Sequence, residues 1–137
     1  MNEQAPFDFL GFKLLKADMH REQDGGVEFI SIRVVQGILD EKTNIFSLDV
    51  TFSFKYLNNS PSHLFFRGAY RIHKYDWYHS LNELQRINQF FQMLFPYIRQ
   101  MAEQITDDIR GWLIVPIIDL SHVNLQVGIT FKPTPKN

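Results

Sequence analysis

The sequence predicts an α+β domain: an antiparallel sheet of four strands, or five, packed on one face by a crossover helix and a long helix. Two observations lead to this prediction. In the first half of the chain apolar and polar residues alternate, which is typical of half-buried strands; after residue 80 the apolar residues recur at helical spacing. No repeat, low-complexity stretch or linker interrupts the 137 residues, so we expect one domain over residues 1–137.

Residues 44–75 give the clearest strand signal. In Asn44–Tyr56 apolar and polar residues alternate with one exception, Ile45, so one face of the strand would be buried and the other exposed to solvent. The apolar face consists of Phe46, Leu48, Val50, Phe52, Phe54 and Tyr56. After a turn at residues 58–62, His63–Tyr75 repeats the pattern. The apolar faces of these two strands are expected to meet the long helix.

Two more strands are predicted nearer the N-terminus. Val27–Leu39 has mixed faces, which indicates cover on both sides or a bulge near Gly37. Phe9–His20 is the weakest of the four, because its phase changes near Leu15. Short turns separate all four runs and favour antiparallel pairing between neighbours in the chain.

The helical part begins at a capping-box pattern, in which Ser80 would cap the helix start and Glu83 would reach back to it. The inward residues of this first helix are expected to be Leu81, Leu84, Ile87, Phe91 and Leu94. Pro96 suits a first helical turn and therefore predicts a fresh start. The second helix would end at Gly111, and its apolar stripe consists of Ile98, Met101, Ala102, Ile105 and Ile109.

The C-terminal part predicts one more strand and a tail. From Val123 to Phe131 apolar residues alternate strictly with polar residues or glycine, as in a half-buried strand. The remaining residues, Lys132–Asn137, are polar or proline, and we expect them to be a disordered tail.

Composition excludes several kinds of site. The chain has no cysteine, which rules out disulfides, thiolate metal sites and thiol nucleophiles. A net charge of -1 without a basic stripe weighs against nucleic-acid binding. No apolar run approaches the roughly 18 residues of a membrane span, and residues 1–5 do not resemble a signal peptide. We therefore expect a cytoplasmic protein.

No catalytic, cofactor or metal site is evident in the sequence. His73 and His79 would share a strand face but lie about 20 Å apart at roughly 3.3 Å per residue, and no third ligand accompanies them. Asp107 and Asp108 diverge as neighbours on a helix and form no acid–base pair. Nucleophile-elbow, Walker and dinucleotide patterns are missing. We expect neither an enzyme nor a cofactor.

Residues 94–125 resemble the protein-export chaperone SecB. Leu94-Phe95-Pro96-Tyr97-Ile98-Arg99 is similar to the Leu-Phe-Pro-Tyr-Ala-Arg that opens the long helix of SecB, and Arg110-Gly111 resembles the pair that closes it. Val123-Asn124-Leu125 resembles the Val-Asn-Phe that follows, with a small shift in spacing. The order of four strands and a crossover segment also matches, so the resemblance covers most of the chain by architecture.

The resemblance implies a cytosolic holdase that binds unfolded polypeptides in exposed apolar grooves, forms dimers that pair into tetramers, and passes clients to the SecA motor. A subgroup of the family instead serves a toxin–antitoxin pair. Asp18 and Glu22 would contact SecA, at the family's spacing in the first strand. The third acid of that patch is missing near Leu64 in the fourth strand, and export SecB has a helix and a longer tail where a strand is predicted here. Both departures weigh against SecA delivery more than against client binding.

A set of aromatic and flexible residues is our candidate client-binding site. These residues lie in the crossover and after the long helix, off the predicted inward stripe: Trp77, Tyr78, Phe90, Met93, Trp112 and Leu113. Each of them alone could equally cap the edge of the core. Together they supply rigid aromatic area and a flexible Met, which suits a surface that binds many clients.

Three classes of function therefore stay open. The first is a SecB-like holdase for unfolded or preprotein polypeptides. The second is a dedicated adaptor or toxin–antitoxin chaperone of the same fold that recognises one protein partner. The third, an enzyme, is the least favoured. We also expect a homodimer or homotetramer, because the off-stripe face of the second helix is rich in Gln, Glu and Thr and suits packing against a symmetry mate.

Overall fold

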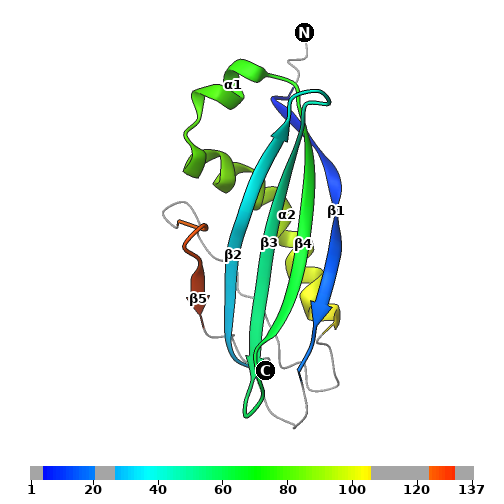
Figure 1. Ribbon diagram of the computed structural model, residues 1–137, viewed down its shortest axis with the longest axis vertical. Coiled ribbons are helices and arrows are strands. Elements are labelled where there is room, and N and C mark those ends of the chain that lie inside the picture. The colour runs from blue at the N-terminus through cyan, green and yellow to red at the C-terminus, as the bar shows by residue number, and fades with distance from the viewer. Residues whose placement is uncertain (1–4, 21–26, 106–123, 132–137) are drawn as a thin grey trace.

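The computed structural model describes residues 5–20, 27–105 and 124–131. Within them the predicted α+β class is confirmed, because a five-stranded antiparallel sheet packs against one long helix (Figure 1). The elements in chain order are β1 (Phe7–Asp18), β2 (Val27–Asp40), β3 (Ile45–Tyr56), β4 (Ser62–Ile72), α1 (Tyr75–Ser80), α2 (Glu83–Ile105) and β5 (Ile129–Phe131).

The strands lie in the order β1-β4-β3-β2-β5. The pairs β2–β3 and β3–β4 follow the predicted pairing between neighbours in the chain, but β1 pairs with β4 and not with β2. In that position the rings of Phe7 and Phe9 contact Tyr70 of β4, with centroids 5.9 and 5.3 Å apart. Strand β1 therefore forms one edge of the sheet, and β2 with its short partner β5 forms the other.

Bulges explain why two strands alternate imperfectly. In β1 the register shifts at Leu10 and again at Leu15, which agrees with the change of phase predicted near Leu15. In β2 a register shift at Val35 confirms a bulge close to Gly37. Each bulge adds a residue without a partner in the ladder, and all three of these apolar side chains are exposed.

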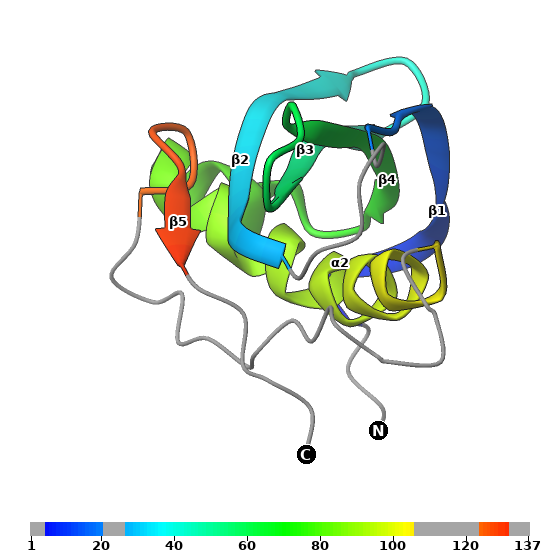
Figure 2. The ribbon, with the colours of Figure 1, turned by 90° about the horizontal axis from the view of Figure 1, so that it is seen from below.

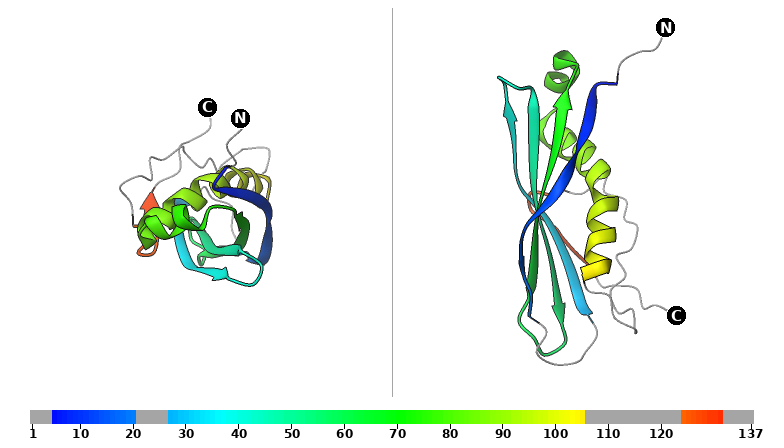
Figure 3. Two further views of the ribbon diagram at one scale, coloured as in Figure 1. Left: turned by 90° about the horizontal axis from the view of Figure 1, so that it is seen from above. Right: turned by 90° about the vertical axis from the view of Figure 1, so that its right-hand side faces the viewer.

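The core lies between the sheet and α2, which runs along the concave side of the curved, twisted sheet (Figures 2 and 3). Strand β3 shows the predicted alternation in full, with every second side chain buried from Phe46 to Tyr56. The Tyr70 hydroxyl of β4 donates a hydrogen bond of 2.5 Å to the Phe90 carbonyl oxygen of α2. Each large apolar side chain buried in this way contributes roughly 1.5–3 kcal/mol.

The helix begins with a different capping box from the predicted one. The Asn82 side chain accepts a hydrogen bond from the Gln85 N–H, at 2.8 Å, and the Gln85 side chain accepts one from the Asn82 N–H, at 2.9 Å. The Ser80 hydroxyl instead donates to the Trp77 carbonyl oxygen and belongs to the end of α1. The predicted Ser80–Glu83 box is therefore wrong by two residues.

The predicted helix break at Pro96 is also wrong, because α2 is continuous through this residue. Proline cannot donate to the carbonyl oxygen four residues earlier, on Gln92. Both Gln92 and Pro96 are exposed, so water can satisfy that oxygen. The inward stripe differs too: Phe90 is fully buried while Leu84 is 39% exposed.

The strand predicted from Val123 to Phe131 is too long. Only Ile129–Phe131 forms β5, while residues 125–127 form a turn. The Asn124 side chain accepts from the Gln126 N–H, and its carbonyl oxygen accepts from the N–H groups of Val127 and Gly128. Asparagine and glycine favour such a turn over an extended strand. Val123, Gly111 and the predicted tail 132–137 lie outside the described residues.

Candidate functional site

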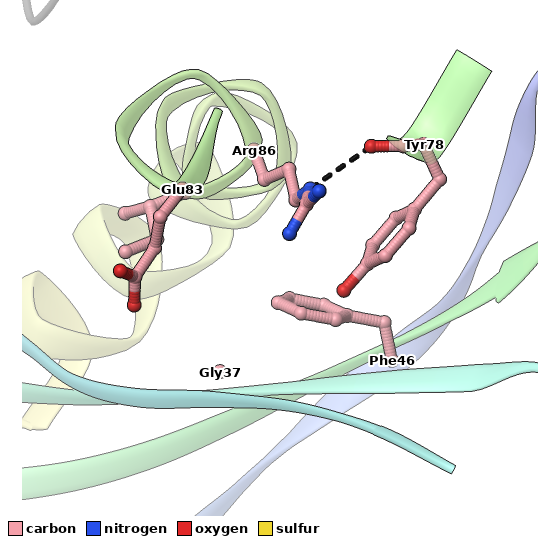
Figure 4. A pocket seen from close by; sticks show the side chains of 6 residues that line it. Gly37, Phe46, Tyr78, Glu83 and Arg86 are labelled. Carbon is pink, nitrogen blue, oxygen red and sulfur yellow. Dashed lines mark hydrogen bonds between the residues drawn. The ribbon is translucent and has the colours of Figure 1, made fainter. Parts of the chain in front are cut away.

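A pocket of about 150 Å³ lies where two strands and both helices meet. The residues that line it are Gly37 of β2, Phe46 of β3, Tyr78 of α1, and Glu83, Arg86 and Ile87 of α2 (Figure 4). The ring of Phe46 packs between those of Tyr78 and Phe90, with centroids 6.0 and 4.5 Å away. The floor of the pocket is thus aromatic, while Glu83 and Arg86 supply two opposite charges.

Arg86 joins the two helices at this pocket. Its Nε donates a hydrogen bond of 2.9 Å to the Tyr78 carbonyl oxygen, and its guanidinium lies 4.4 Å from the centroid of the Tyr78 ring (Figure 4). Burial raises the pKa of Tyr78, although the charge of Arg86 partly opposes this. The phenol therefore stays neutral at physiological pH, and α1 is held against α2 by a cation–π contact and a charged hydrogen bond.

The pocket lies beside a strand edge that is only partly covered. Strand β5 pairs with Ile30–Ile32 of β2, and the Val34 N–H donates to the Leu125 carbonyl oxygen at 2.8 Å. Among the described residues, no strand pairs with the outer edge of β2 from Val35 to Asp40. Val35 and Ile38 are also 52% and 55% exposed. This stretch offers main-chain hydrogen-bonding groups and apolar side chains together.

A second apolar surface follows the other edge of the sheet, where β1 borders α2. We call it the β1–α2 seam. Its members are Phe7, Phe9 and Phe12 of β1, Trp77 of α1, and Tyr97 of α2 together with Met93, which lies one helical turn before Tyr97. The ring of Tyr97 contacts Phe9 and Phe12, with centroids 5.2 and 5.3 Å away. Trp77 stacks on Phe7 at 5.5 Å. Met93 and Tyr97 are 45% and 43% exposed, so the seam presents apolar area to solvent.

The structure separates the predicted client-binding residues. Trp77 is half-buried and Met93 is exposed, and both belong to the β1–α2 seam. Phe90 and Tyr78 are 0% and 6% exposed, so placing them away from the core was wrong. Phe90 follows Ile87 by three residues and precedes Leu94 by four, a helical spacing that could have assigned it inward. Trp112 and Leu113 lie outside the described residues.

Sequence reasoning missed most of the pocket. From the sequence, Gly37 indicates only a bulge, and Phe46 only a core position of a strand. Arg86 gave no signal, because a single charged residue on a helix is usually solvated. What brings them together is the short helix α1, in a part of the chain where the sequence pattern indicates only the end of a strand and a crossover.

The predicted SecA-contact residues are only partly described. Asp18 ends β1, where its carboxylate oxygen lies 3.1 Å from Nε2 of the half-exposed His20. Glu22 lies outside the described residues. On the same outer face of the sheet Asp49 accepts two hydrogen bonds from Arg67, at 2.7 and 3.0 Å. These bonds hold the pKa of Asp49 below its usual value.

The described residues contain no group of three or more His, Asp or Glu side chains that could hold a metal ion. His73 and His79, considered above as ligands, make separate contacts: His73 Nε2 lies 2.7 Å from an Asp8 oxygen, and His79 packs on Tyr75. In the same part of the chain, no helix is long and apolar enough to cross a membrane.

Comparison with solved structures gives a match to the fold. A SecB-like chaperone of Mycobacterium tuberculosis, solved in complex with a ChAD peptide from the HigA1 antitoxin, superposes with a TM-score of 0.56. The match covers 82% of this chain and 91% of that chain at 12% sequence identity. The fold is SecB-like. No model of a known protein family and no curated protein sequence matches this chain. The SecB-like fold thus confirms the architecture that the resemblance implied.

Proposed function

We propose that this protein is a SecB-like chaperone that holds unfolded or preprotein polypeptides in an extended form. The observation that supports this most directly is the position of the pocket at Gly37 beside Val35–Asp40 of β2, an edge with no strand partner within residues 5–20, 27–105 and 124–131. A strand edge binds main chain regardless of sequence, and an adjacent apolar pocket takes one side chain. This combination suits a client that is extended and recognised by few features.

The geometry of the edge indicates how such a client would lie. In β2, Gly37 and Leu39 are paired with Leu48 and Phe46 of β3, whose side chains are buried on the inner face of the sheet. An added strand would place alternate side chains on the same inner face. One of these would approach the pocket at Gly37, where the Phe46 ring lies over the backbone because no side chain separates them. We propose that this position takes an apolar or aromatic client side chain.

The β1–α2 seam is the second part of the proposed client surface. Trp77 and Met93 belong to it, and we keep them as client-binding residues together with Trp112 and Leu113. Rigid aromatic rings with an unbranched Met adapt to many apolar partners. An extended polypeptide could contact both edges of the sheet, and each contact would add to the overall affinity.

A dedicated adaptor of the same fold is the second candidate. The observation that favours it is the comparison structure, in which the SecB-like chaperone carries a peptide of an antitoxin. A pocket with a charged rim, as formed here by Glu83 and Arg86, also suits one defined sequence better than many. Delivery to SecA through Asp18 and Glu22 is a further proposal, and so is a cytoplasmic location.

We also propose that the chain works as a homodimer or homotetramer of single SecB-like domains, each spanning residues 1–137. Two surfaces support self-association. The outer edge of β1 has no strand partner among the described residues, and the outer face of α2 exposes uncharged amides at Gln89, Gln92 and Gln100. Light scattering at micromolar concentration should give a multiple of 16.2 kDa. A monomer of that mass would contradict the proposal.

The function itself is tested with a panel of unrelated unfolded proteins that aggregate on dilution from denaturant. A general holdase should suppress aggregation of most of them at stoichiometric concentration, and a dedicated adaptor should suppress one or none. For the adaptor, the antitoxin-type partner would be sought among the products of neighbouring genes. If neither the panel nor such a partner binds, the proposed function is wrong.

A further inference from the structure

One part of the chain already occupies the stretch of the β2 edge next to the proposed client site, from Ile30 to Val34. Residues 124–131, which we call the internal segment, run beside β2, where Ile129, Thr130 and Phe131 pair with Ile32, Ser31 and Ile30. Figures 1 and 2 show β5 alongside β2, on the side away from β3. The internal segment therefore stands where an extended polypeptide would add to the sheet.

The contacts that hold the internal segment imitate those of a bound peptide. Leu125 is fully buried in the core, and its carbonyl oxygen accepts the Val34 N–H. The Gln126 carbonyl oxygen accepts a hydrogen bond of 3.1 Å from Arg33 Nε. The Gln126 side chain donates at 2.9 Å to Glu83, which lines the pocket. The buried Leu125 and a short run of hydrogen bonds thus hold the internal segment against the edge of β2.

The internal segment makes few contacts with β2, and its backbone is bent. Strand β5 has three residues, whereas β3, on the other side of β2, has twelve. Gly128 has a φ of 99°, a conformation that other residues adopt only under strain, and Val127 is 79% exposed. A longer extended chain would make more ladder hydrogen bonds with β2 than the internal segment does. Such a chain would therefore compete with the internal segment for the β2 edge.

We propose that the internal segment is a built-in competitor, which covers Ile30–Val34 of the β2 edge in the free protein and is displaced when an extended client pairs along the whole edge, from Ile30 to Asp40. This inference rests on the proposed function, because it concerns regulation of the same edge. Two consequences follow. Short or weakly apolar peptides fail to displace β5, and successful clients carry alternating apolar residues, as Ile129 and Phe131 do opposite Ile32 and Ile30.

A reversible lock tests the proposal on the full-length chain. Ser31 and Thr130 are direct cross-strand partners, whose Cα atoms are expected to lie about 4.5–5.5 Å apart, within the range of a disulfide. Ser31→Cys with Thr130→Cys therefore creates a disulfide between β2 and β5. The natural chain has no cysteine, so no other disulfide can form within one chain, and non-reducing gel electrophoresis shows any disulfide between chains. The matched control is Ser47→Cys with Ala69→Cys, partners in β3 and β4.

The probe is fluorescently labelled α-lactalbumin, reduced and carboxymethylated so that it stays unfolded under both redox conditions. The locked, oxidised protein should bind it at least tenfold more weakly than the same protein after reduction, and the control pair should show no difference. Equal binding by both forms, or equal weakening in the control pair, would overturn the inference and leave the proposed function intact. If the reduced and wild-type proteins also fail to bind, the proposed function fails and the inference falls with it.

A second variant acts in the opposite direction and needs no disulfide. A Cβ atom at Gly128 would lie 3.3 Å from the Ile32 carbonyl oxygen, in a strained conformation. Gly128→Ala should therefore loosen β5 and strengthen probe binding several-fold. Val127→Ala, at the exposed neighbouring position, is the control and should leave affinity unchanged. Unchanged or weaker binding by Gly128→Ala would also count against a competing segment.

Discussion

The ring of Phe46 in β3 lies over Gly37 of β2, so closely that a Cβ atom at Gly37 would come within 2.5 Å of Phe46 Cζ. The two residues are diagonal neighbours, because Gly37 is paired with Leu48. Phe46 is also stacked on Phe90 and packed against Tyr78, so it has little freedom to move away. The aromatic floor of the pocket thus depends on the absence of a side chain at position 37.

Gly37→Ala should consequently reduce both stability and client binding. Overpacking of this kind costs about 1–3 kcal/mol, and the added methyl group would stand at the mouth of the pocket. Urea denaturation measures the first effect and probe binding the second. For the stability measurement, Val35→Ala, on the same strand but 52% exposed, is the matched control, with a change expected within about 0.5 kcal/mol. If Gly37→Ala binds the probe like wild type, the pocket is not part of the client site.

The contact between Arg86 and Tyr78 predicts how firmly α1 is held. Arg86→Met keeps the length of the side chain but removes the hydrogen bond to the Tyr78 carbonyl oxygen and the cation–π contact. A loss of about 1–2 kcal/mol is expected from these two contacts together. Hydrogen exchange should then speed up in residues 75–80 more than in β3. Equal protection of α1 in the variant and the wild type would show that the contact is not what holds the helix.

The Asp49–Arg67 pair predicts a pH dependence of stability. The hydrogen bonds from Arg67 hold the pKa of Asp49 below its ordinary 3.8 in the folded state. The contribution is therefore fully present above the unfolded pKa and is lost as pH falls through the lower, folded pKa. At neutral pH Asp49→Asn should lower the free energy of unfolding by about 1 kcal/mol, since Arg67 is partly exposed.

The same comparison repeated at falling pH gives the decisive measurement. Below about pH 4 the difference in free energy of unfolding between wild type and Asp49→Asn should shrink. Protonation of Asp49 in the wild type then removes the charged hydrogen bonds that the variant also lacks. Glu28→Gln, which removes the more exposed ion pair with Lys55, is the control and should change stability much less at every pH. A gap that stays constant down to pH 3 would contradict the assignment.

The buried hydroxyl of Tyr70 anchors the sheet to α2. Burial raises its pKa, so it remains a hydrogen-bond donor to the Phe90 carbonyl oxygen at any moderate pH. Tyr70→Phe should cost about 1 kcal/mol of stability while leaving the ring packing intact. Tyr97→Phe, at a ring 43% exposed, should cost less. Urea midpoints compare the two variants, and a larger loss for Tyr97→Phe would reverse the interpretation.

The sequence predicted the strands well and the site poorly, for physical reasons. The period-two alternation of β3 follows directly from one buried face, so Phe46 to Tyr56 could be assigned from the pattern alone. The pairing of β1 with β4 could not, since β1 carries two bulges that blur its period. The pocket depends on Tyr78, which faces the core only because α1 turns the chain back after β4. With six residues, α1 is too short to show a helical period of apolar residues, so the sequence pattern does not reveal it.

The last prediction concerns Trp77, the described tryptophan of the β1–α2 seam. It stacks on Phe7 and meets the edge of Phe90, yet it is only half-buried, so a client could reach its free side. Trp77→Ala, and likewise Trp112→Ala, should weaken client binding severalfold while the oligomer stays folded. Trp77→Phe is the matched control, because a Phe ring can keep the stack on Phe7, and it should lose less affinity.

Fluorescence separates the two tryptophans, which are the only two in the chain. In Trp112→Phe all tryptophan emission comes from Trp77, and in Trp77→Phe it comes from Trp112. Saturating client should shift the Trp77 emission to shorter wavelength and reduce its quenching by iodide, because the ring loses water on one side. If client changes neither signal in Trp112→Phe, Trp77 is not covered by client, and its half-exposed ring serves only to close the core beside Phe7.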